Sequence, residues 1–569
     1  MMEIDLPLAR RRRITSGQLV AAIAALLVVG FFPRAHAAPA AARPNIVFVL
    51  TDDQRWNSLG VTGNPVVKTP HLDRLAAEGV LFEQGTITSA ICTPSRACYF
   101  LGQYERRHGV NFNSGTAMKE NAWSKSYPVL LRAAGYFTGY VGKNHVPVGE
   151  EGYASGTIER SFDFWYAGHN ALGFYPKNRH PVFRSAKADT QIEIIAEGAA
   201  NFLRPEQPFI AGAQSFLKSR PADRPFCLTV AFNVPHAAGT SSMEQRPSDP
   251  ELYRTTYRDQ LATQPIPRTY VAKADVRAPK LPPEVHHAQY RQKSYDYVDT
   301  EAALRERQIR EYQTISGIDR LVGAIRAQLD KLGCADNTVI LFSSDHGITH
   351  GEFGLGGKAL NYDTCLRVPM IAFDPRAAKN LEAHRSAALV QSIDFAPTML
   401  DLAGLPVPAT MQGESFRPAL EGRAFAGRRH AFAENLWSTY FGNPRIESVR
   451  TADWKYIRTF ANDRSIFSRA AGEGEGGAIN DELAATYAKW LTATIRGEKP
   501  VYEELYDLRA DPDEAVNLAA APAHAETLRA LRAECQRLVT AAKGDVSQPP
   551  ATVRLQNARE ARGAKTKSR

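Results

Sequence analysis

Three continuous apolar runs lie far apart in the chain, and each is followed by polar or charged residues. They are NIVFVLTDD at 45–53, FCLTVAF at 226–232 and NTVILFSSD at 337–345. Continuous runs rich in β-branched residues are typical of parallel strands buried on both faces. Apolar residues spaced by three and four from 315 to 329, and the segment HLDRLAAEGV at 71–80, predict intervening helices.

Strands that alternate with helices predict an α/β fold, with a large mixed, mostly parallel sheet sandwiched by helices over residues 44–427. The stretch 237–308 is rich in Pro, Arg and Tyr without clear periodicity, so we expect a long excursion over the active face. From 428 the pattern changes. The segment 446–460 is strand-like, and 502–519 leads into an amphipathic helix near 526–541. We therefore predict a smaller C-terminal α+β subdomain over 428–545.

The first 37 residues have the features of an export signal. Four arginines at 10–13 precede an apolar run at 19–32, and AHA at 35–37 suits signal peptidase. The run is shorter than the roughly 20 residues that span a bilayer. We predict a signal peptide at 1–37, a spacer at 38–43, a periplasmic or secreted protein, and no stable membrane insertion. An uncleaved anchor is the alternative, and the arginines leave a twin-arginine route open.

The net charge of +9 belongs mostly to the two ends of the 569-residue chain. Residues 1–37 hold five arginines against two acids, and residues 551–569 hold six lysines and arginines against one acid. The body between them is nearly neutral, so its charge does not indicate nucleic-acid binding. Residues 546–569 are predicted to be a basic disordered tail.

The six cysteines are too few and too scattered for a disulfide scaffold, and no two have the spacing of a zinc site. A single disulfide bridge stays open as an alternative.

Acidic residues follow two of the three predicted strands. Asp52 and Asp53 end the first run, and Asp345 and His346 end the third. In open α/β sheets, binding sites gather at the carboxyl ends of strands. Three carboxylates with one imidazole there predict a site for a hard divalent cation, although each residue alone is as typical of a helix cap or a surface charge.

Basic residues in three segments are candidates for the same site. Lys143 and His145 lie in GYFTGYVGKNH, His236 follows FNVP, and Lys358 follows the glycine-rich GEFGLGG. Lysines are usually solvated, but glycines near Lys358 allow the backbone to approach a ligand closely. A metal with several cations predicts a pocket for a tetrahedral oxyanion ester, with the metal as Lewis acid.

The segment ICTPSRACYFLG places a cysteine at a predicted helix start. Pro94 suits the first helical turn, which puts Cys92 near the N-cap, where the free N–H groups favour anions. Arg96, one turn later, can reach back towards Cys92. By these residues alone, Cys92 is either a buried structural thiol or a thiolate nucleophile of lowered pKa.

The motif CTPSR, followed by LGQYERRHG, closely resembles the maturation signature of type I sulfatases, in the alkaline-phosphatase-like superfamily. The segments PNIVFVLTDDQ, GYFTGYVGKNH, SSDHG, GLGGK, RVPMI and SIDFAPTMLDLAGL resemble further motifs of that family, in the family's order, and the resemblance extends over roughly 500 residues. It implies a sulfuric ester hydrolase that acts on sulfate monoesters.

The resemblance also implies a mechanism. A formylglycine-generating maturation enzyme would convert Cys92 to Cα-formylglycine, whose hydrate attacks sulfur and forms a covalent sulfo-enzyme intermediate. The cation would be held by Asp52, Asp53, Asp345 and His346 with residue 92. Many relatives have Asn where His346 stands, and calcium is expected, with magnesium as the alternative.

The remaining roles are implied in the same way. Arg96 would orient the diol, and His145 would help to deprotonate it. Lys143 and Lys358 would contact sulfate oxygens, and His236 would be a general acid or a sulfate ligand.

Two other functions stay open at this point. Relatives in the same superfamily are phosphonate or phosphate monoester hydrolases, and an inactive relative could act as a glycan-binding module. We expect a sulfated carbohydrate as the substrate, with recognition residues in 165–180 and 237–308.

Overall fold

The computed structural model describes residues 43–112, 116–196, 212–239, 243, 245–282, 295–381, 384–436, 445–461, 481–547 and 550–554. The chain divides into two units, Met1–Ala42 and Arg43–Arg569, and every described residue belongs to the second. The predicted signal peptide and nearly all of the predicted spacer therefore lie outside the described residues. Among the helices that the structure describes, none has both the length and the apolar character needed to cross a bilayer.

An eight-stranded sheet forms the centre of this unit, in the order β11-β2-β10-β7-β1-β6-β4-β5. Its strands are β1 (Asn45–Asp52), β2 (Val80–Thr86), β4 (Phe137–Asn144), β5 (Phe164–His169), β6 (Phe226–Pro235), β7 (Thr338–Ser344), β10 (Ile371–Phe373) and β11 (Arg385–Gln391). β1 is parallel to β6 and β7, so the three apolar runs are adjacent strands. Only β10, among these strands, runs antiparallel to its neighbours. The predicted mixed, mostly parallel sheet is confirmed.

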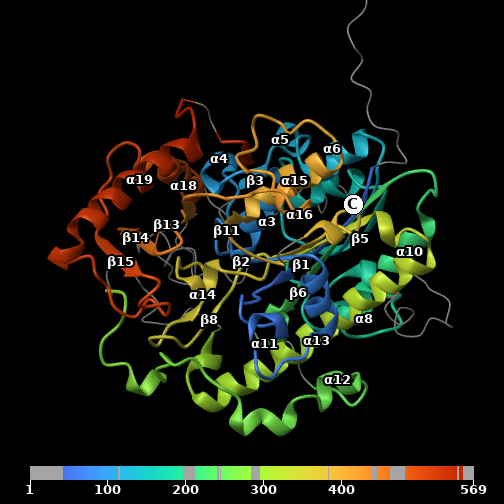
Figure 1. The fold of residues 1–569 in the computed structure, drawn as a ribbon, viewed down its shortest axis with the longest axis horizontal. Helices are drawn as coiled ribbons and strands as arrows, with labels where there is room; N and C mark the ends of the chain where they lie inside the picture. Colours follow the sequence, from blue (N-terminus) through green and yellow to red (C-terminus); the bar gives the residue numbers. More distant parts are fainter. Residues whose placement is uncertain are drawn as a thin grey trace, which may run out of the picture. The chain divides into compact units, whose positions relative to one another are not determined.

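Helices cover both faces of this sheet. The longer ones are α2 (Pro70–Glu78), α3 (Cys92–Leu101), α6 (Tyr127–Ala133), α10 (Ala213–Ser219), α13 (Glu301–Lys331) and α15 (Phe395–Leu402). Phe48 of β1 packs against Tyr99 of α3 and Phe395 of α15 in one apolar core. Val47, which points to the other face, belongs to a second core with Leu72 of α2 and Ile318 of α13. Figure 1 shows α3 and α15 on one side of β1 and α13 on the other.

Short elements connect the central strands and helices. They are α4 (Glu105–His108), α5 (Glu120–Trp123), α7 (Thr157–Arg160), α8 (Gln191–Ile195), α11 (His236–Gly239), α12 (Glu251–Arg254), α14 (Asp363–Leu366), α16 (Arg417–Leu420), β3 (Thr116–Met118), β8 (Thr349–His350) and β9 (Gly356–Gly357).

The predicted helix at 315–329 is confirmed, but it begins much earlier than the apolar spacing indicates. α13 starts at Glu301, where the Thr300 hydroxyl accepts a hydrogen bond from the Ala303 N–H. Residues 301–308 of the expected irregular excursion are therefore helical. Their polar side chains conceal the helical period, because this end of α13 packs against loops as well as against the apolar core.

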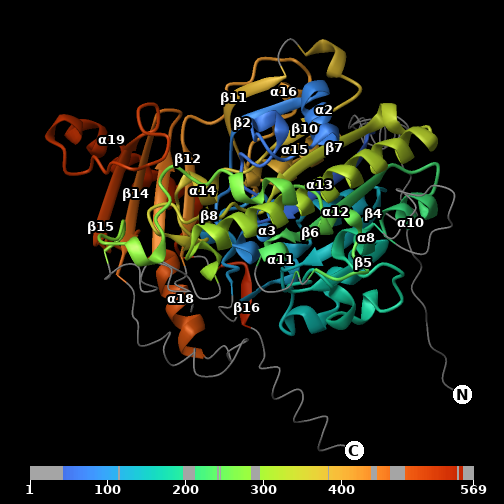
Figure 2. The same cartoon turned by 90° about the horizontal axis from the view of Figure 1, so that it is seen from below.

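A second, antiparallel sheet forms the C-terminal subdomain, which confirms the predicted α+β subdomain. Its strands follow the order β12 (Ala431–Asn435), β13 (Arg445–Arg450), β14 (Trp454–Phe460) and β15 (Tyr502–Asp507). α19 (Ala525–Lys543) packs on this sheet through Leu528, Leu531 and Val539, and α18 (Asp481–Ala493) precedes β15. Figures 1 and 2 show β13–β15 and α19 at one end of the central sheet.

Two details of this region differ from the sequence predictions. The strand-like segment 446–460 is a hairpin of β13 and β14, because the Thr451 hydroxyl accepts hydrogen bonds from the N–H groups of Asp453 and Trp454 and closes a tight turn. Part of the predicted disordered tail forms a strand, β16 (Thr552–Arg554), which pairs with β3. Residues 555–569 lie outside the described part of the chain.

Glu105 in α4 is a fully buried carboxyl group that joins α4 to its surroundings. Its Oε2 accepts a hydrogen bond from the Ser89 hydroxyl at 2.7 Å, and its Oε1 accepts one from the Tyr487 hydroxyl at 3.1 Å and one from the Asn111 amide. Burial, and then the nearby Glu434 carboxylate, raise the pKa of Glu105 to about 8. The fold therefore favours the protonated acid.

Replacing Glu105 with glutamine is expected to make stability less sensitive to pH. Because the pKa of Glu105 is raised above the ordinary 4.5, its contribution to the free energy of unfolding is complete below about pH 4.5. That contribution is lost as the pH rises through about 8. Glutamine has nearly the shape of the protonated acid and stays uncharged at every pH. At about pH 9 the variant should therefore be more stable than wild type by at least about 1 kcal/mol. Thermal melts across this pH range measure the difference. Glu150→Gln, at an exposed glutamate, is the control, and parallel melting curves for E105Q and wild type contradict the prediction.

Candidate active site

The chemically active residues of several motifs meet at the carboxyl end of the central sheet. Asp52 is the last residue of β1, and Asp345 directly follows β7. Asp53 has a φ of 62°, in the left-handed region, so the chain turns here and both neighbouring carboxylates can face the site. Lys143 lies in β4, and His236 opens α11 directly after β6. Since these strands are parallel, their carboxyl ends share one edge.

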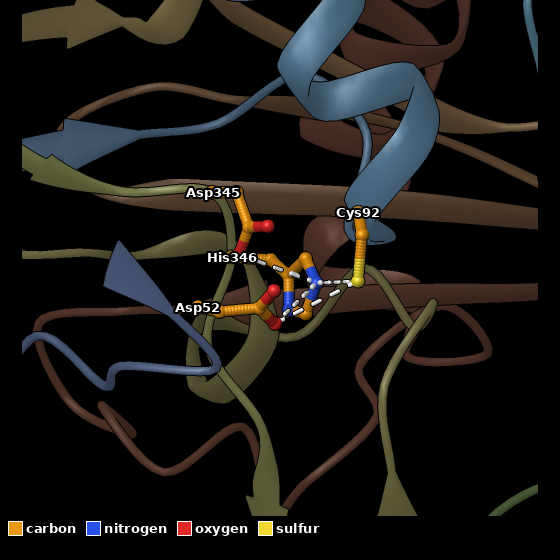
Figure 3. Close-up of side chains that lie close together, drawn as sticks. All are labelled: Asp52, Cys92, Asp345 and His346. Atoms are coloured by element: carbon orange, nitrogen blue, oxygen red, sulfur yellow. Dashed lines mark hydrogen bonds and ion pairs between the residues drawn. The ribbon is translucent and has the colours of Figure 1, made fainter. Parts of the chain in front are cut away.

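Cys92 is the first residue of α3, and Pro94 lies in the first turn of this helix, as the sequence predicts. The Cys92 side chain points into the acidic cluster (Figure 3). Its Sγ is 3.2 Å from His346 Nε2, 3.3 Å from Lys358 Nζ and 3.6 Å from Asp52 Oδ1. Burial and Asp52 oppose ionisation, but Lys143, Lys358 and His346 outweigh them and lower the pKa of the thiol to about 7.

Four side chains offer ligand atoms to a common point. One ligand atom from each of Asp52, Cys92, Asp345 and His346 lies within 4.8 Å of the others, and all four residues are buried. Asp53 joins them through its Oδ1, 3.1 Å from His346 Nδ1. In the part that the structure describes, Asp53 Oδ2 and Asp345 Oδ1 are buried and accept no hydrogen bond. Orphaned carboxylate oxygens of this kind fit a hard cation.

The closely packed charges lower the pKa of one group in this cluster and raise the pKa of two others. Burial raises the pKa of Asp52, but Lys143 and other cations reverse this and bring it well below the ordinary value. Burial and the Asp52 carboxylate raise the pKa of Asp345 to about 6. Burial opposes a charged His346, yet Asp345 prevails and raises its pKa to about 9. These shifts favour an ionised Asp52 carboxylate and a protonated His346 imidazole.

Each cation of the site contacts one or more of these carboxylates. Arg96 is fully buried, and its Nε lies 2.8 Å from Asp345 Oδ2 while one Nη lies 3.2 Å from Asp52 Oδ2. The Lys143 ammonium donates to Asp52 Oδ2, and the Lys358 ammonium donates to Asp53 Oδ1 at 3.0 Å. Arg96 thus fixes two acids, and both lysines face the space beside Cys92.

The two histidines outside the acidic cluster are held neutral. Burial, and then Lys143, keep the pKa of His145 well below its ordinary value. Burial, and then Lys358, lower the pKa of His236 to about 3. Of the two roles that the family resemblance implies for His236, that of a general acid needs a pKa near the working pH, and burial moves the pKa of His236 away from it. A neutral imidazole still donates a hydrogen bond from its one N–H.

Three residues near the site were missed by the sequence predictions. Ser95 donates its hydroxyl proton to the Asp345 carbonyl at 2.5 Å, and Asn233 contacts the His236 ring at 2.8 Å. Both lie inside quoted motifs, CTPSR and FNVPH, which is the signal that could have found them. Tyr295, whose phenol is hydrogen-bonded to Lys358, comes from the non-periodic excursion, where no pattern singles it out.

All six cysteines, each of which lies in the described residues, are free, so the disulfide left open by the sequence is not formed. Cys98 is fully buried, with its Sγ 3.3 Å from His108 Nε2, as expected for a packed residue on α3.

A cavity of about 550 Å³ adjoins the acidic cluster at Asp53. Part of the predicted recognition segment, residues 264–269, lines it, together with α13 and residues 512–514. The Arg367 guanidinium lies over the Trp56 ring in its wall, 4.0 Å from the ring centroid. The other predicted segment, 165–180, does not line this cavity; within it, His169 Nδ1 contacts the amide of Asn144, the residue after Lys143, at 2.9 Å.

Comparison with known proteins identifies relatives over most of the chain. A family model described as Sulfatase matches residues 44–405, and one described as N-sulphoglucosamine sulphohydrolase, C-terminal, matches residues 351–468. The chain is 28% identical to the N-acetylglucosamine-6-O-sulfatase of Bacteroides thetaiotaomicron over 83% of its length and 88% of that protein. It is also 28% identical to human N-sulphoglucosamine sulphohydrolase, over 86% of this chain and 89% of the relative.

Solved structures share this fold at lower sequence identity. One, a complex with its substrate D-glucosamine-2-N,6-O-disulfate, has a TM-score of 0.62 at 22% identity and covers 90% of this chain and 99% of its own. A phosphonate monoester hydrolase from Silicibacter pomeroyi has a TM-score of 0.65 at 21% identity, over 89% of this chain and 96% of its own. At these identities the likeness concerns the fold alone.

Proposed function

The chain belongs to the sulfatase family and is a sulfuric ester hydrolase, and from this we propose that it removes sulfate monoesters from carbohydrate. The observation that carries the proposal is the position of Cys92, which faces three carboxylates and two lysines at the carboxyl end of the sheet. A sulfate monoester is a tetrahedral anion, and a site that pairs a cation with two ammonium groups suits it.

We propose that Asp52, Asp53, Asp345 and His346 hold a divalent cation together with residue 92. The orphaned oxygens of Asp53 and Asp345 support this assignment, because a hard cation would satisfy both. We assign calcium, with magnesium as the alternative. When bound, the cation supplies Lewis-acid polarisation of the ester's oxygens and of the nucleophile.

We propose further that a formylglycine-generating maturation enzyme, which supplies its own oxidant, converts Cys92 to an aldehyde; the sulfur leaves, an oxygen takes its place, and addition of water gives a geminal diol. One diol oxygen attacks sulfur, and the ester's alcohol leaves, so that residue 92 carries a covalent sulfate. Loss of the second hydroxyl's proton, helped by His145, then expels sulfate and regenerates the aldehyde. Arg96 holds Asp52 and Asp345 in place, while Lys143 and Lys358 face the sulfate oxygens.

A carbohydrate is the substrate class that the relatives and the cavity favour. Two matched relatives are named for sulfated glucosamine derivatives. The cavity beside Asp53 has a volume of about 550 Å³ and a mixed lining of polar and aromatic side chains, including Gln54, Gln308, Trp56 and Tyr312. Such a lining suits a sugar, which has both hydroxyl groups and apolar ring faces.

The two alternative functions have less support. The phosphonate monoester hydrolase is 21% identical, which speaks for the fold and not for the reaction. An inactive glycan-binding relative would have no need for all ten of the residues to which the family resemblance assigns catalytic or metal-binding roles, and the chain has every one of them.

Export remains part of the proposal. The basic and apolar pattern of residues 1–37 supports a signal peptide and a periplasmic or secreted enzyme.

Sulfatase activity is tested with purified protein from a host that has formylglycine maturation machinery. We expect turnover of 4-nitrophenyl sulfate, slower or absent turnover of a phosphonate monoester or diester, and release of sulfate from a panel of sulfated mono- and oligosaccharides. Preferential hydrolysis of the phosphonate overturns the proposal. Binding of sulfated glycan without release of sulfate by fully matured protein favours the inactive relative.

A further inference from the structure

Asn233 lies at the end of β6 and contacts the ring of His236, three residues later. The Asn233 side-chain nitrogen is 2.8 Å from His236 Nδ1, and Asn233 is almost completely buried. Its backbone is fixed as well, because the Asn233 N–H donates to Gln191 Oε1 at 2.7 Å. The family resemblance assigns no role to Asn233, and Asn233 takes part in none of the ion pairs described above.

The orientation of the Asn233 amide follows from a backbone donor on its other side. The Leu172 N–H donates to Asn233 Oδ1 at 2.7 Å. An N–H group needs an acceptor, so the amide oxygen must face Leu172 and the amino group must face His236. A flipped amide would place two donors against each other at the Leu172 contact.

This orientation determines where the proton of His236 is. The Asn233 amino group is a donor only, so His236 Nδ1 must accept and cannot carry a hydrogen. In the neutral ring the proton then lies on Nε2. Both ring nitrogens lie near site carboxylates, with Nε2 3.8 Å from Asp53 Oδ2 and Nδ1 3.9 Å from Asp52 Oδ1, so it is the hydrogen bond from Asn233 that selects Nε2 as the protonated nitrogen. The His236 carbonyl accepts from an Arg307 Nη at 3.2 Å, which holds the backbone of the same residue.

His346 shows the opposite arrangement. Its Nδ1 lies 3.0 Å from the Gly347 carbonyl, which can only accept, so Nδ1 carries the proton when the ring is neutral. The Nε2 lone pair of His346 is then available to a cation beside Cys92. His236 could be grouped with Asp52 and Asp53 as a second set of metal ligands, but Nδ1 accepts the hydrogen bond from Asn233 and Nε2 is protonated, so neither ring nitrogen has a free lone pair to offer.

We propose that Asn233 is a positioning residue that holds His236 as the Nε2–H tautomer. In this form His236 donates a hydrogen bond to the leaving oxygen of the substrate, and it stays outside the metal's coordination shell. The inference rests on the proposed sulfatase function for its catalytic half. The tautomer itself depends only on the contacts among Leu172, Asn233 and His236.

The tautomer is tested first, without any assay of activity. Nitrogen NMR of protein labelled with ¹⁵N-histidine, with the signals assigned by His236→Gln, should show an unprotonated Nδ1 and a protonated Nε2 in the wild type. Asn233→Asp replaces the donor with an acceptor, so the Nδ1 signal should move to the protonated range. A wild-type Nδ1 that already carries the proton overturns the proposal, as does an Nε2 signal that changes to an unprotonated, metal-bound form when calcium is added.

The catalytic half is tested by the leaving group. Asn233→Leu keeps the approximate size but removes the donor, so His236 loses its fixed orientation. We expect kcat to fall at least about tenfold for phenyl sulfate, whose leaving oxygen carries most of the developing negative charge, and less than about threefold for 4-nitrophenyl sulfate, whose nitro group delocalises that charge. His236→Ala should show the same selectivity, and the double variant should be no slower than His236→Ala.

The possible results distinguish the role of Asn233 from the sulfatase function itself. Equal slowing of both esters by Asn233→Leu, or purely additive losses in the double variant, overturns the role of Asn233 in catalysis. A wild-type protein that is matured but hydrolyses neither ester overturns the sulfatase function instead, and leaves the NMR result to decide the tautomer.

Discussion

Replacement of Cys92 with alanine is expected to abolish turnover of 4-nitrophenyl sulfate, with kcat lowered by at least about 10⁴-fold, as is typical when an enzyme loses its nucleophile. The Cys92 side chain lies 3.6 Å or less from the side chains of Asp52, Lys358 and His346, which puts residue 92 at the centre of the proposed cation and sulfate site. Cys98→Ala, six residues along the same helix and away from the carboxylates, is the matched control. Residual activity of Cys92→Ala within tenfold of wild type would show that residue 92 is not the nucleophile.

Cys92→Ser separates the two halves of the proposed reaction. A serine hydroxyl can attack sulfur and expel the alcohol, but it has no second hydroxyl with which to release sulfate. We expect one equivalent of alcohol and then no further turnover, with a stable mass increase of about 80 Da on the protein. In the matured wild type, the peptide that contains residue 92 should be about 18 Da lighter than the cysteine form. A fully active wild type with an intact cysteine contradicts the modification.

Removal of divalent cations is expected to have the second largest effect. Asp52, Asp53 and Asp345 converge with His346 in a buried site, and two of their oxygens accept no hydrogen bond. Chelation should therefore remove at least about 99% of the activity and lower the melting temperature, because the carboxylates then repel one another. Calcium should restore both, and metal analysis of the restored enzyme compares calcium with magnesium.

Asp345→Asn provides the genetic counterpart of chelation. It should lower activity at least about 10²-fold and make the melting temperature insensitive to calcium. Asp319→Asn is the control, since Asp319 is a buried carboxyl on α13 whose Oδ1 accepts from the Leu72 N–H, remote from the site. An Asp345→Asn variant whose activity and calcium-dependent stabilisation match those of Asp319→Asn would contradict the metal assignment.

The sequence predicted the central sheet well because burial leaves a direct trace in composition. Strands β1, β6 and β7 are covered on both faces, so almost every position must be apolar until the strand ends. The polar residues that interrupt such a run are then conspicuous. Asp52, Asp53 and Asp345 could be placed together from this pattern alone.

Other features had no comparable trace. The start of α13 at Glu301 depends on a cap by Thr300, and the hairpin of β13 and β14 depends on one threonine hydroxyl. Asn233 and Tyr295 act through contacts with residues that are close in space, and a buried amide or phenol has many structural uses. The neutral state of His236 was unforeseen because it results from burial, which no single motif reports.

The burial of α3 has a consequence for when the enzyme can be made active. All ten residues of the helix, from Cys92 to Leu101, are buried, and Arg96 is tied to Asp52 and Asp345. A modifying enzyme needs to grip several residues on either side of the thiol, and the folded chain exposes none of them. The proposed oxidation would therefore have to precede folding. Molecules that fold before they are oxidised would stay permanently unmodified. The active fraction of a preparation would therefore depend on the rate of Cys92 oxidation relative to the rate of folding.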